Sequence, residues 1–530
     1  MSPELKRHEA LAAALLRPEA YPEPVAAVNR IETHISTILL AGGHAYKIKK
    51  PLDLGFLDYS TLEKRRQACD EELRLNQRTA AALYRDVVAI VGPLGAPHFA
   101  AAPGTPGADV IDYAVRMRRF DPEATLDRIA ARGELDATII DRLAETVARF
   151  HAETPPAPSG FGGPATIERW ALENFVSMRP YVQSAADRAR LDALETWSRS
   201  ESAALRGTME SRVQSGRVRE CHGDLHLGNL VLLDERPVAF DAIEFNAELR
   251  CIDVMSDVAF TFMDLLDHAL PRLAWRFVSA YLEASGDYEG LAVLRFYSVY
   301  RALVRAKVAL IRLHQPYLSH HIRLREHTSF EHYVALAERL QRQAAAVLVA
   351  MSGLSGSGKS TVAQTLAERL GGVRIRSDVE RRRLFGIART APSGGGIYTP
   401  EANELVYARL GDCARAGIRA LVPAVLDAAF LRRRERRQAR ALAQELGAVF
   451  CVVACTAPFE LLRERVAARG ALGLDPSEAD AAVLERQLEW YEPPADDETR
   501  WTHFIDTGPG ASIEDGCREL ASALLDSAAR

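Results

Sequence analysis

The sequence predicts two successive domains: an α+β domain, and then an α/β domain with a mostly parallel sheet. The chain has 530 residues, too many for one hydrophobic core. Its first part carries the pattern H-x-D-x-x-x-x-N at 222–229, followed by two short apolar strands. Its second part carries a buried strand, the pattern G-x-x-x-x-G-K-[ST] at 353–360, and a helix. Composition changes near Ala344, so we expect domains at 1–343 and 344–530.

Composition excludes several classes of protein. Apolar residues make up 48% and charged residues 26%, as in soluble globular proteins. No apolar run approaches the roughly 18 residues of a membrane span, and Leu11–Leu16 is too short for a signal peptide. The seven cysteines form no CxxC pair, which favours reduced thiols and a cytoplasmic location. A net charge of −5 argues against general nucleic-acid binding.

The polar residues of the first motif fit phosphoryl transfer. That chemistry needs an Asp that orients the acceptor hydroxyl and takes its proton, with an Asn and a second Asp that hold Mg²⁺. Asp224, Asn229 and Asp241 occur in this order, separated by short strands that would place them at one sheet edge. The alternative is a polar turn between two strands, with Asp241 as a surface carboxylate.

The wording H-G-D-L-H-x-G-N at 222–229 resembles the aminoglycoside phosphotransferase family, a small-molecule branch of the kinase-like fold. The resemblance implies an N-lobe at about 1–119 and a C-lobe at about 120–343, with ATP and Mg²⁺ as cofactors. It also implies that Asp257 braces the backbone of the catalytic loop. The alternative for Asp257 is that it caps its own helix. We interpret His151 as a structural residue at a helix end.

The N-lobe is predicted from strands within 28–50, followed by a helix that begins with the capping box Ser60-x-x-Glu63 and reaches about Leu83. A kinase-like N-lobe pairs a strand Lys with a helix Glu to fix the α- and β-phosphates. We expect Lys47 in this role, with Lys49 close behind, since both lie on one strand face. Glu72 is the preferred partner, because Glu71 points further round the helix. The alternative is a pair of surface lysines on an edge strand. No G-x-G-x-x-G loop precedes the lysines, so 33–36 would have to cover the phosphates.

The second motif follows a predicted strand at 345–350 and precedes a predicted helix at 362–370. Its glycines let backbone N–H groups converge on phosphates, its Lys neutralises them, and its Ser reaches Mg²⁺. The expected nucleotide-binding residues are Gly353, Ser355, Gly356, Ser357, Gly358, Lys359, Ser360 and Thr361.

Two carboxylates extend this second site. Asp378 follows the predicted strand 373–375, at the edge where ligands bind in parallel sheets. The run Ser-Asp-x-x-Arg there resembles small P-loop kinases of the gluconate kinase, polynucleotide kinase and zeta-toxin type, which implies that Asp378 binds or deprotonates the acceptor hydroxyl. The alternative is that it caps its helix. Asp427 ends a predicted strand at 420–426 and is a candidate ligand of Mg²⁺ through water, although Pro423 is unusual inside a strand.

Two arginines and a loop complete the prediction. Arg465 and Arg469 share a helix face and resemble the lid arginines of small kinases, which stabilise charge on the transferred phosphoryl group. The alternative is a solvated basic face. The Gly-rich segment Ala391–Gly396 is expected to form a loop over the acceptor.

The sequence therefore predicts an enzyme with two ATP- and Mg²⁺-dependent phosphoryl transfers to hydroxyls of small molecules, one in each domain. The fusion resembles bacterial proteins described as bifunctional phosphotransferase/ATP-binding proteins. Residues 260–335 offer no dense acidic cluster, which argues against an aminoglycoside as the acceptor. The alternative is a kinase-like regulatory module joined to a P-loop kinase that acts on a nucleic-acid end or a nucleotide sugar. The sequence leaves the oligomeric state open.

Overall fold

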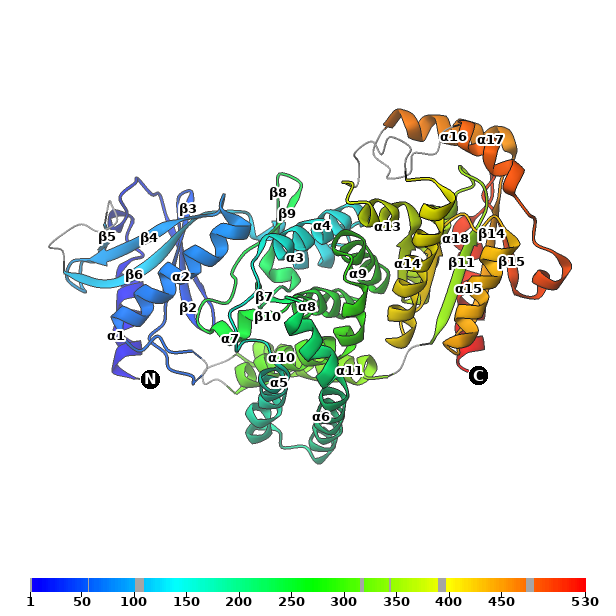
Figure 1. Ribbon diagram of the computed structural model, residues 1–530. Coiled ribbons are helices and arrows are strands. Elements are labelled where there is room, and N and C mark those ends of the chain that lie inside the picture. Colours follow the sequence, from blue (N-terminus) through cyan, green and yellow to red (C-terminus); the bar gives the residue numbers. More distant parts are fainter. Residues whose placement is uncertain are drawn as a thin grey trace. The chain divides into compact units, whose positions relative to one another are not determined.

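The chain is described by a computed structural model (Figure 1). It describes residues 2–55, 57–100, 109–314, 319–342, 345–388, 397–472 and 481–530, without the side chains of 469–472. The chain forms two compact units. The first unit contains Met1–Leu135, Phe150–Ile167 and Glu210–Thr261, and the second contains Asp136–Arg149, Glu168–Met209 and Phe262–Arg530. The predicted domain boundary at 343/344 lies outside the described residues, and the lobe limit near 119/120 stays a prediction.

The first unit contains a sheet of six strands in the described residues, all antiparallel, in the order β1-β2-β3-β6-β4-β5. Alternating apolar side chains place Leu39, Tyr46, Ile48 and Ile90 in its core, which explains why these segments form strands. The strand bounds are β1 (Val28–Glu32), β2 (Ser36–Ala41), β3 (His44–Lys49), β4 (Tyr84–Val91), β5 (His98–Phe99) and β6 (Val110–Arg118).

Two helices pack against this sheet. Helix α1 (Pro3–Ala14) is followed by a separate turn, η1 (Pro18–Ala20). Helix α2 (Leu62–Ala80) packs on β4 and β6. The capping box predicted from Ser60 is wrong. The Thr61 hydroxyl accepts the N–H of Lys64 at 3.2 Å, and the Ser60 hydroxyl donates to Asp58 instead. Adjacent Ser and Thr make this shift of one residue invisible in the pattern.

The segment that carries the first motif also lies in the first unit. Strands β8 and β9 pair with Leu230 opposite Ala239, and β7 pairs with β10. This pairing brings 222–229 and the residues after Ala239 to the same end of a two-stranded sheet. The bounds are β7 (Val218–Glu220), η4 (Leu227–Asn229), β8 (Leu230–Leu233), β9 (Arg236–Ala239), α7 (Ala247–Arg250) and β10 (Cys251–Asp253).

Helices make up most of the chain between β6 and residue 342. Gly286 ends α9 in the left-handed conformation, with φ of 71°, as glycine does at many helix ends. Helices α10 and α11 pack along each other. The bounds are η2 (Pro122–Ala124), α3 (Leu126–Ala131), α4 (Ala137–Glu153), α5 (Pro164–Met178), η3 (Arg179–Tyr181), α6 (Ala185–Gln214), α8 (Val254–Asp267), α9 (Pro271–Ser285), η5 (Tyr288–Gly290), α10 (Leu291–Leu313) and α11 (His320–Leu340).

The second unit contains a parallel sheet of five strands in the described residues, in the order β12-β13-β11-β14-β15. The central strand β11 is buried throughout, and α12 and α18 cover it. This is the mostly parallel α/β architecture that the sequence predicts. The strand bounds are β11 (Val347–Ser352), β12 (Val373–Arg376), β13 (Ala424–Asp427), β14 (Val449–Thr456) and β15 (Thr502–Asp506). The helix bounds are α12 (Lys359–Leu370), α13 (Ser377–Leu384), α14 (Pro400–Arg419), α15 (Arg433–Glu445), α16 (Phe459–Leu472), α17 (Ala481–Trp490), η6 (Asp496–Trp501) and α18 (Ile513–Ala528).

Strand β13 corrects one expectation. It begins at Ala424, so Pro423 precedes the strand instead of interrupting it. Leu421 has φ of 59°, and this turn separates α14 from β13. The missing N–H of proline therefore costs the sheet no hydrogen bond within the strand.

Two further features concern the cysteines and the helices of the described residues. All seven cysteines lie in the described part of the chain, where they are free and buried. A search of the described residues finds no helix whose length and hydropathy would let it cross a bilayer.

Candidate active sites

The loop 222–229 holds Asp224 and Asn229 together. The Asn229 amide donates to the carboxylate Oδ2 and to the backbone oxygen of Asp224, each at 3.0 Å. Asn229 is 9% exposed, whereas the Asp224 side chain is 35% exposed. The loop therefore holds this carboxylate on one side, while the side chain keeps some exposure to solvent.

His222 anchors the same loop to the neighbouring strand. Its Nε2 donates to the Phe240 oxygen at 2.9 Å, and its Nδ1 accepts the Asp224 N–H at 3.3 Å. Burial lowers the pKa of His222, although the carboxylates of Asp257 and Asp224 oppose this, so the ring is neutral and one tautomer satisfies both bonds. His222 thus orients the backbone at Asp224.

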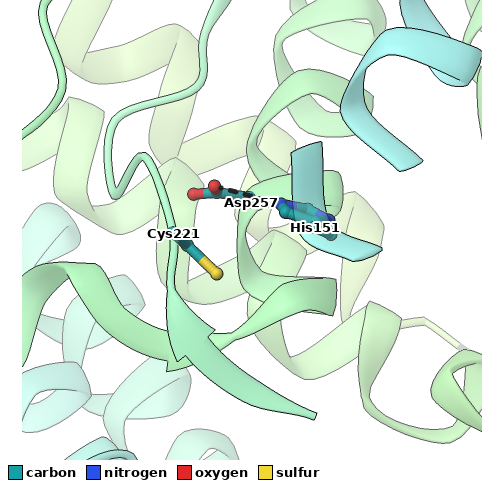
Figure 2. Close-up of side chains that lie close together, drawn as sticks. All are labelled: His151, Cys221 and Asp257. Atoms are coloured by element: carbon teal, nitrogen blue, oxygen red, sulfur yellow. Dashed lines mark hydrogen bonds and ion pairs between the residues drawn. The ribbon is translucent and has the colours of Figure 1, made fainter. Parts of the chain in front are cut away.

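Asp257, in the first turn of α8, braces this loop as the family resemblance implied. Its Oδ2 accepts the His222 N–H at 2.8 Å, and its Oδ1 accepts the Gly223 N–H at 2.9 Å. Figure 2 shows that His151 approaches the same carboxylate, with Nε2 at 3.4 Å from Oδ2. Cys221 lies beside them, and burial raises the pKa of its thiol well above the ordinary value. Because both oxygens of Asp257 serve the loop backbone, this buried cluster is structural.

The predicted Lys–Glu ion pair is present between β3 and α2. Lys47 Nζ lies 2.9 Å from Oε1 of Glu72 and also contacts Asp241. Burial by itself lowers the pKa of Lys47, but Asp241 and Glu72 outweigh it, so the pKa rises well above its ordinary value. Lys47 is therefore a charged ammonium that connects α2 to the second acidic residue of the motif.

Lys49 has different surroundings. It is fully buried and contacts the carboxylates of Glu72 and Glu244, and Tyr59 donates to the same oxygen of Glu244. Burial lowers the pKa of Lys49, but Glu244 and Glu72 reverse the shift and raise it. Of the two lysines, Lys47 is the one in contact with Asp241.

Asp241 occupies a strained turn. Its φ is 65°, which is unusual for a residue with a side chain. The Tyr84 hydroxyl accepts the Asp241 N–H at 3.1 Å, and Asn76 Oδ1 accepts the N–H of Ala242 at 2.9 Å. The Phe240 N–H donates to the Asn229 oxygen at 3.0 Å, so Asn229 and Asp241 are near neighbours. An Asn and an Asp at the end of paired strands fit a hard cation such as Mg²⁺.

In the second unit, the loop after β11 has the backbone of a phosphate-binding loop. Gly353, Gly356 and Gly358 have φ of 145°, 82° and 76°. A Cβ at Gly356 would lie 2.6 Å from the Leu462 oxygen, so only glycine fits. Gln487 of α17 accepts the Ser355 N–H at 2.8 Å, which shows that a loop N–H is directed at an acceptor.

The residues at the start of α12 fit a metal-bound nucleotide. The Ser360 hydroxyl donates to Oδ1 of Asp427 at 3.2 Å. Asp427 is 6% exposed, and its Oδ2 has no hydrogen-bond partner in the described part of the chain. A buried carboxylate oxygen of this kind suits Mg²⁺ or a water bound to it. Lys359 Nζ donates to the Leu354 oxygen at 2.8 Å, across the same loop.

Asp378 is in the first turn of α13, directly after β12. The N-cap position of this helix is Arg376, so Asp378 is not the capping residue. The Ser377 hydroxyl donates to the backbone oxygen of Asp427 at 3.1 Å, which connects this turn to strand β13. Burial lowers the pKa of Arg381, and the Asp378 carboxylate opposes this effect.

Arg465 lies against the phosphate loop. It donates to the Gly356 oxygen at 3.3 Å and to the Thr507 oxygen at 2.7 Å. The Thr507 hydroxyl in turn donates to the Ser357 oxygen at 3.0 Å. The guanidinium thus supports the back of the loop. The side chain of Arg469 and the loop Ala391–Gly396 lie outside the described residues.

Sequence reasoning missed Glu244, Tyr59, Tyr84 and Asn76 at the first site, and Thr507 at the second. Glu244 follows Asp241 by three residues, which was the one available signal. The others come from distant segments, and only folding brings them to the site.

Comparisons with known proteins agree with this geometry. A family model described as "Phosphotransferase enzyme family" matches residues 61–297, and one described as "AAA domain" matches residues 348–494. Uncharacterized proteins of Mycobacterium tuberculosis strain H37Rv and of Mycobacterium bovis are each 29% identical to this chain over 468 residues. These residues are 87% of this chain and 90% of each relative.

Two solved structures are also similar. A choline/ethanolamine kinase family protein from Mesorhizobium loti is 14% identical, with a TM-score of 0.34, and the match covers 63% of this chain and 99% of that one. A gluconokinase from Sinorhizobium meliloti 1021 is 23% identical, with a TM-score of 0.26, and the match covers 35% of this chain and 96% of that one. Residues 61–297 thus match a phosphotransferase family model on a kinase-like fold, and residues 348–494 match an AAA domain model on a P-loop domain with a parallel sheet, so the chain joins a phosphotransferase-type domain to a P-loop domain.

Proposed function

We propose that the chain is a bifunctional phosphotransferase with one active site in each domain, each using ATP and Mg²⁺ to phosphorylate a hydroxyl of a small molecule. The contact of Lys47 with both Glu72 and Asp241, in the same unit as Asp224, carries the proposal for the first site. These are the groups that kinase-type phosphoryl transfer requires.

The roles at the first site follow from the surroundings of each group. Lys47 would neutralise the α- and β-phosphates, and Asn229 and Asp241 would hold Mg²⁺. The acceptor hydroxyl gives its proton to the Asp224 carboxylate while the hydroxyl oxygen bonds to the γ-phosphorus. The bond between the γ-phosphorus and the ADP oxygen breaks at the same time. The accessible side chain of Asp224 supports this role.

At the second site, loop N–H groups and Lys359 would bind phosphates, while Ser360 and Asp427 would hold Mg²⁺ or its water. Asp378 is the proposed acceptor-side base, because it lies next to Ser377, which bonds to the strand of Asp427. Arg465 is proposed to stabilise the loop that carries the phosphates. The buried Oδ2 of Asp427, which accepts no hydrogen bond in the described part of the chain, supports the role of Asp427 at Mg²⁺.

An active first domain is favoured over a regulatory module by Asp224. A domain that only binds metal and nucleotide has a use for Asn229 and Asp241, but little use for a carboxylate that meets the acceptor hydroxyl. The acceptors are proposed to be metabolites whose chemistry the two folds leave open.

The first site is tested in protein that carries Lys359→Ala, so that remaining transfer comes from the first domain. This protein is incubated with γ-labelled ATP and a metabolite extract, with and without Asp224→Asn. We expect labelled small molecules, a loss of labelling of roughly 10²-fold or more with Asp224→Asn, and unchanged nucleotide affinity. Equal labelling with and without Asp224, or no labelling, would show that the first domain is not a kinase.

The second site is tested by Asp378→Asn in protein that carries Asp224→Asn. If Asp378 is the base, single-turnover transfer falls by roughly 10²-fold while the melting temperature and ATP affinity stay unchanged. A lower melting temperature with an unchanged rate would assign Asp378 to stability of α13 alone.

A further inference from the structure

Helix α9 covers the open edge of the parallel sheet within the second unit. It packs against α12 and β12, and β12 is the edge strand of the sheet. The Ser279 hydroxyl accepts the Arg374 N–H at 2.8 Å. This bond satisfies a backbone donor that the sheet edge leaves without a strand partner. Helix α9 ends at Ser285 and β11 begins at Val347, so this contact joins segments that are far apart in the sequence.

A buried carboxylate on α9 meets two arginines of β12. Glu283 is 4% exposed, and its Oε2 lies 3.1 Å from Nη2 of Arg374. Its Oε1 lies 3.5 Å from Nη1 of Arg376. A buried charge is stable only when it is paired, so these three side chains depend on one another.

Arg376 also faces the metal-site carboxylate of the P-loop domain. It lies opposite Asp427 in the β12–β13 register, and its Nε is 3.8 Å from Oδ2 of Asp427. This is the oxygen that has no hydrogen-bond partner in the described part of the chain, while Oδ1 accepts from Ser360. One guanidinium thus lies between two carboxylates, Glu283 and Asp427.

This arrangement creates a competition for Asp427. A guanidinium that pairs fully with Asp427 would occupy the oxygen that suits Mg²⁺, and two positive charges on one carboxylate repel each other. Glu283 gives Arg376 a second carboxylate, at the shorter distance of 3.5 Å against 3.8 Å. The guanidinium of Arg376 therefore stays beyond hydrogen-bonding distance of the Asp427 carboxylate.

We infer that Glu283 is a positioning residue for the P-loop site: it holds Arg376 away from Asp427 and so keeps that carboxylate available to Mg²⁺. The inference rests on the proposed nucleotide-binding function of this site. It makes α9, which precedes the P-loop domain in the sequence, part of the metal site of that domain.

The test measures Mg²⁺ dependence rather than catalysis. Full-length protein with Lys47→Met, which weakens the first site, is the parent. A fluorescent ADP analogue is titrated without Mg²⁺ and then over a range of Mg²⁺ concentrations. With Glu283→Gln, we expect the Mg²⁺ midpoint to rise about tenfold, with binding in the absence of Mg²⁺ changed by less than about twofold. Adding Arg376→Gln should bring the midpoint back to the parent value or below it, because Asp427 then faces no arginine.

Glu514→Gln is the matched control. Glu514 pairs with Arg272 of α9 at 2.7 Å and is 46% exposed, so this variant removes a contact of the same helix without touching the Glu283 pairs. Its Mg²⁺ midpoint should equal that of the parent. If Glu283→Gln protein does not fold, the Arg376→Gln single variant tests the inference. Removing the arginine beside Asp427 should lower the Mg²⁺ midpoint severalfold.

The outcomes separate the two proposals. A parent protein without Mg²⁺-dependent nucleotide binding would overturn the function proposed for the site and the inference with it. Mg²⁺-dependent binding in the parent with an unshifted midpoint in Glu283→Gln, or without recovery in the double variant, overturns only the role of Glu283. An equal loss of affinity with and without Mg²⁺ would likewise reduce Glu283 to a structural ion pair, as would a midpoint that Arg376→Gln alone does not lower.

Discussion

At the scale of residues, two lysines on one strand face have different tasks. Lys47 contacts Asp241, whose side chain is 40% exposed, and so borders an accessible region. Lys49 is fully buried between the carboxylates of Glu72 and Glu244. Exposure of the acidic partner therefore distinguishes a ligand-binding lysine from one that compensates buried charge.

The first prediction contrasts Lys47→Met with Lys49→Met, in protein that carries Lys359→Ala. Lys47→Met should weaken ATP binding at the first site by about tenfold or more, because a charge beside the phosphates is lost. Lys47→Met should cost less stability than Lys49→Met, since Glu72 keeps its contact with Lys49 and Asp241 is partly solvated.

Lys49→Met is the matched variant on the same strand. It leaves the buried carboxylate of Glu244 without its cation, which should cost about 3–5 kcal/mol of unfolding free energy. Calorimetric melting and nucleotide titration measure both effects. The reverse pattern, with Lys49→Met weakening ATP binding in a stable protein, would exchange the roles of the two lysines.

At the scale of elements, α1 is attached to the sheet through a buried histidine. His8 Nε2 lies 2.9 Å from the Thr37 hydroxyl, which itself donates to Glu32. His8 therefore donates the proton of this bond. Burial lowers the pKa of His8 from its usual 6.5 to about 4, with Glu9 opposing and Lys50 reinforcing the shift.

The second prediction is a pH dependence of stability from His8. The unfolded chain binds a proton at this side chain near pH 6.5, whereas the folded chain resists protonation until about pH 4. The contribution of neutral His8 to the unfolding free energy is therefore complete above pH 6.5, and it is lost as the pH falls from there through 4. The shift corresponds to about 3 kcal/mol of unfolding free energy at most.

His8→Gln, which does not titrate, should flatten the fall in urea midpoint between pH 7 and pH 4.5. The exposed His98 gives the control, and His98→Gln should follow the parent curve. An identical slope in His8→Gln and parent protein would exclude His8 as its source.

At the scale of the whole chain, helix α9 contacts the sheet edge of the P-loop domain through Ser279 and Glu283. It also contacts α12, where Arg276 lies 3.0 Å from Glu368. A P-loop domain cut at residue 345 loses these partners. The partly buried Arg374 and the buried Arg376 then keep positive charge at the edge strand without Glu283.

The third prediction concerns that fragment. Residues 345–530 alone should melt at a lower temperature than a fragment that begins at residue 268 and retains α9, and should need more Mg²⁺ to bind nucleotide. Melting curves and Mg²⁺ titrations of the two fragments measure this. Equal stability and equal Mg²⁺ midpoints would show that α9 contributes nothing to the domain.

The sequence by itself determined the two motif loops, because their chemistry depends on local backbone geometry. Gly353, Gly356 and Gly358 must let N–H groups converge within a few residues, and 222–229 must place Asp224 and Asn229 on one turn. Such requirements appear as fixed residue types at fixed spacing. The order of the two domains and the Lys–Glu pairing were therefore predictable.

Only the tertiary structure decided what surrounds these loops. A strand period of two puts Lys47 and Lys49 on the same face, so the choice between them depends on Glu244 and Asp241, which arrive from far along the chain. Adjacent Ser60 and Thr61 offered two equivalent caps, which only the helix phase distinguished. Glu283 reaches Arg376 across 93 residues, and no local pattern encodes that encounter, because burial and pairing of charge are properties of the folded chain.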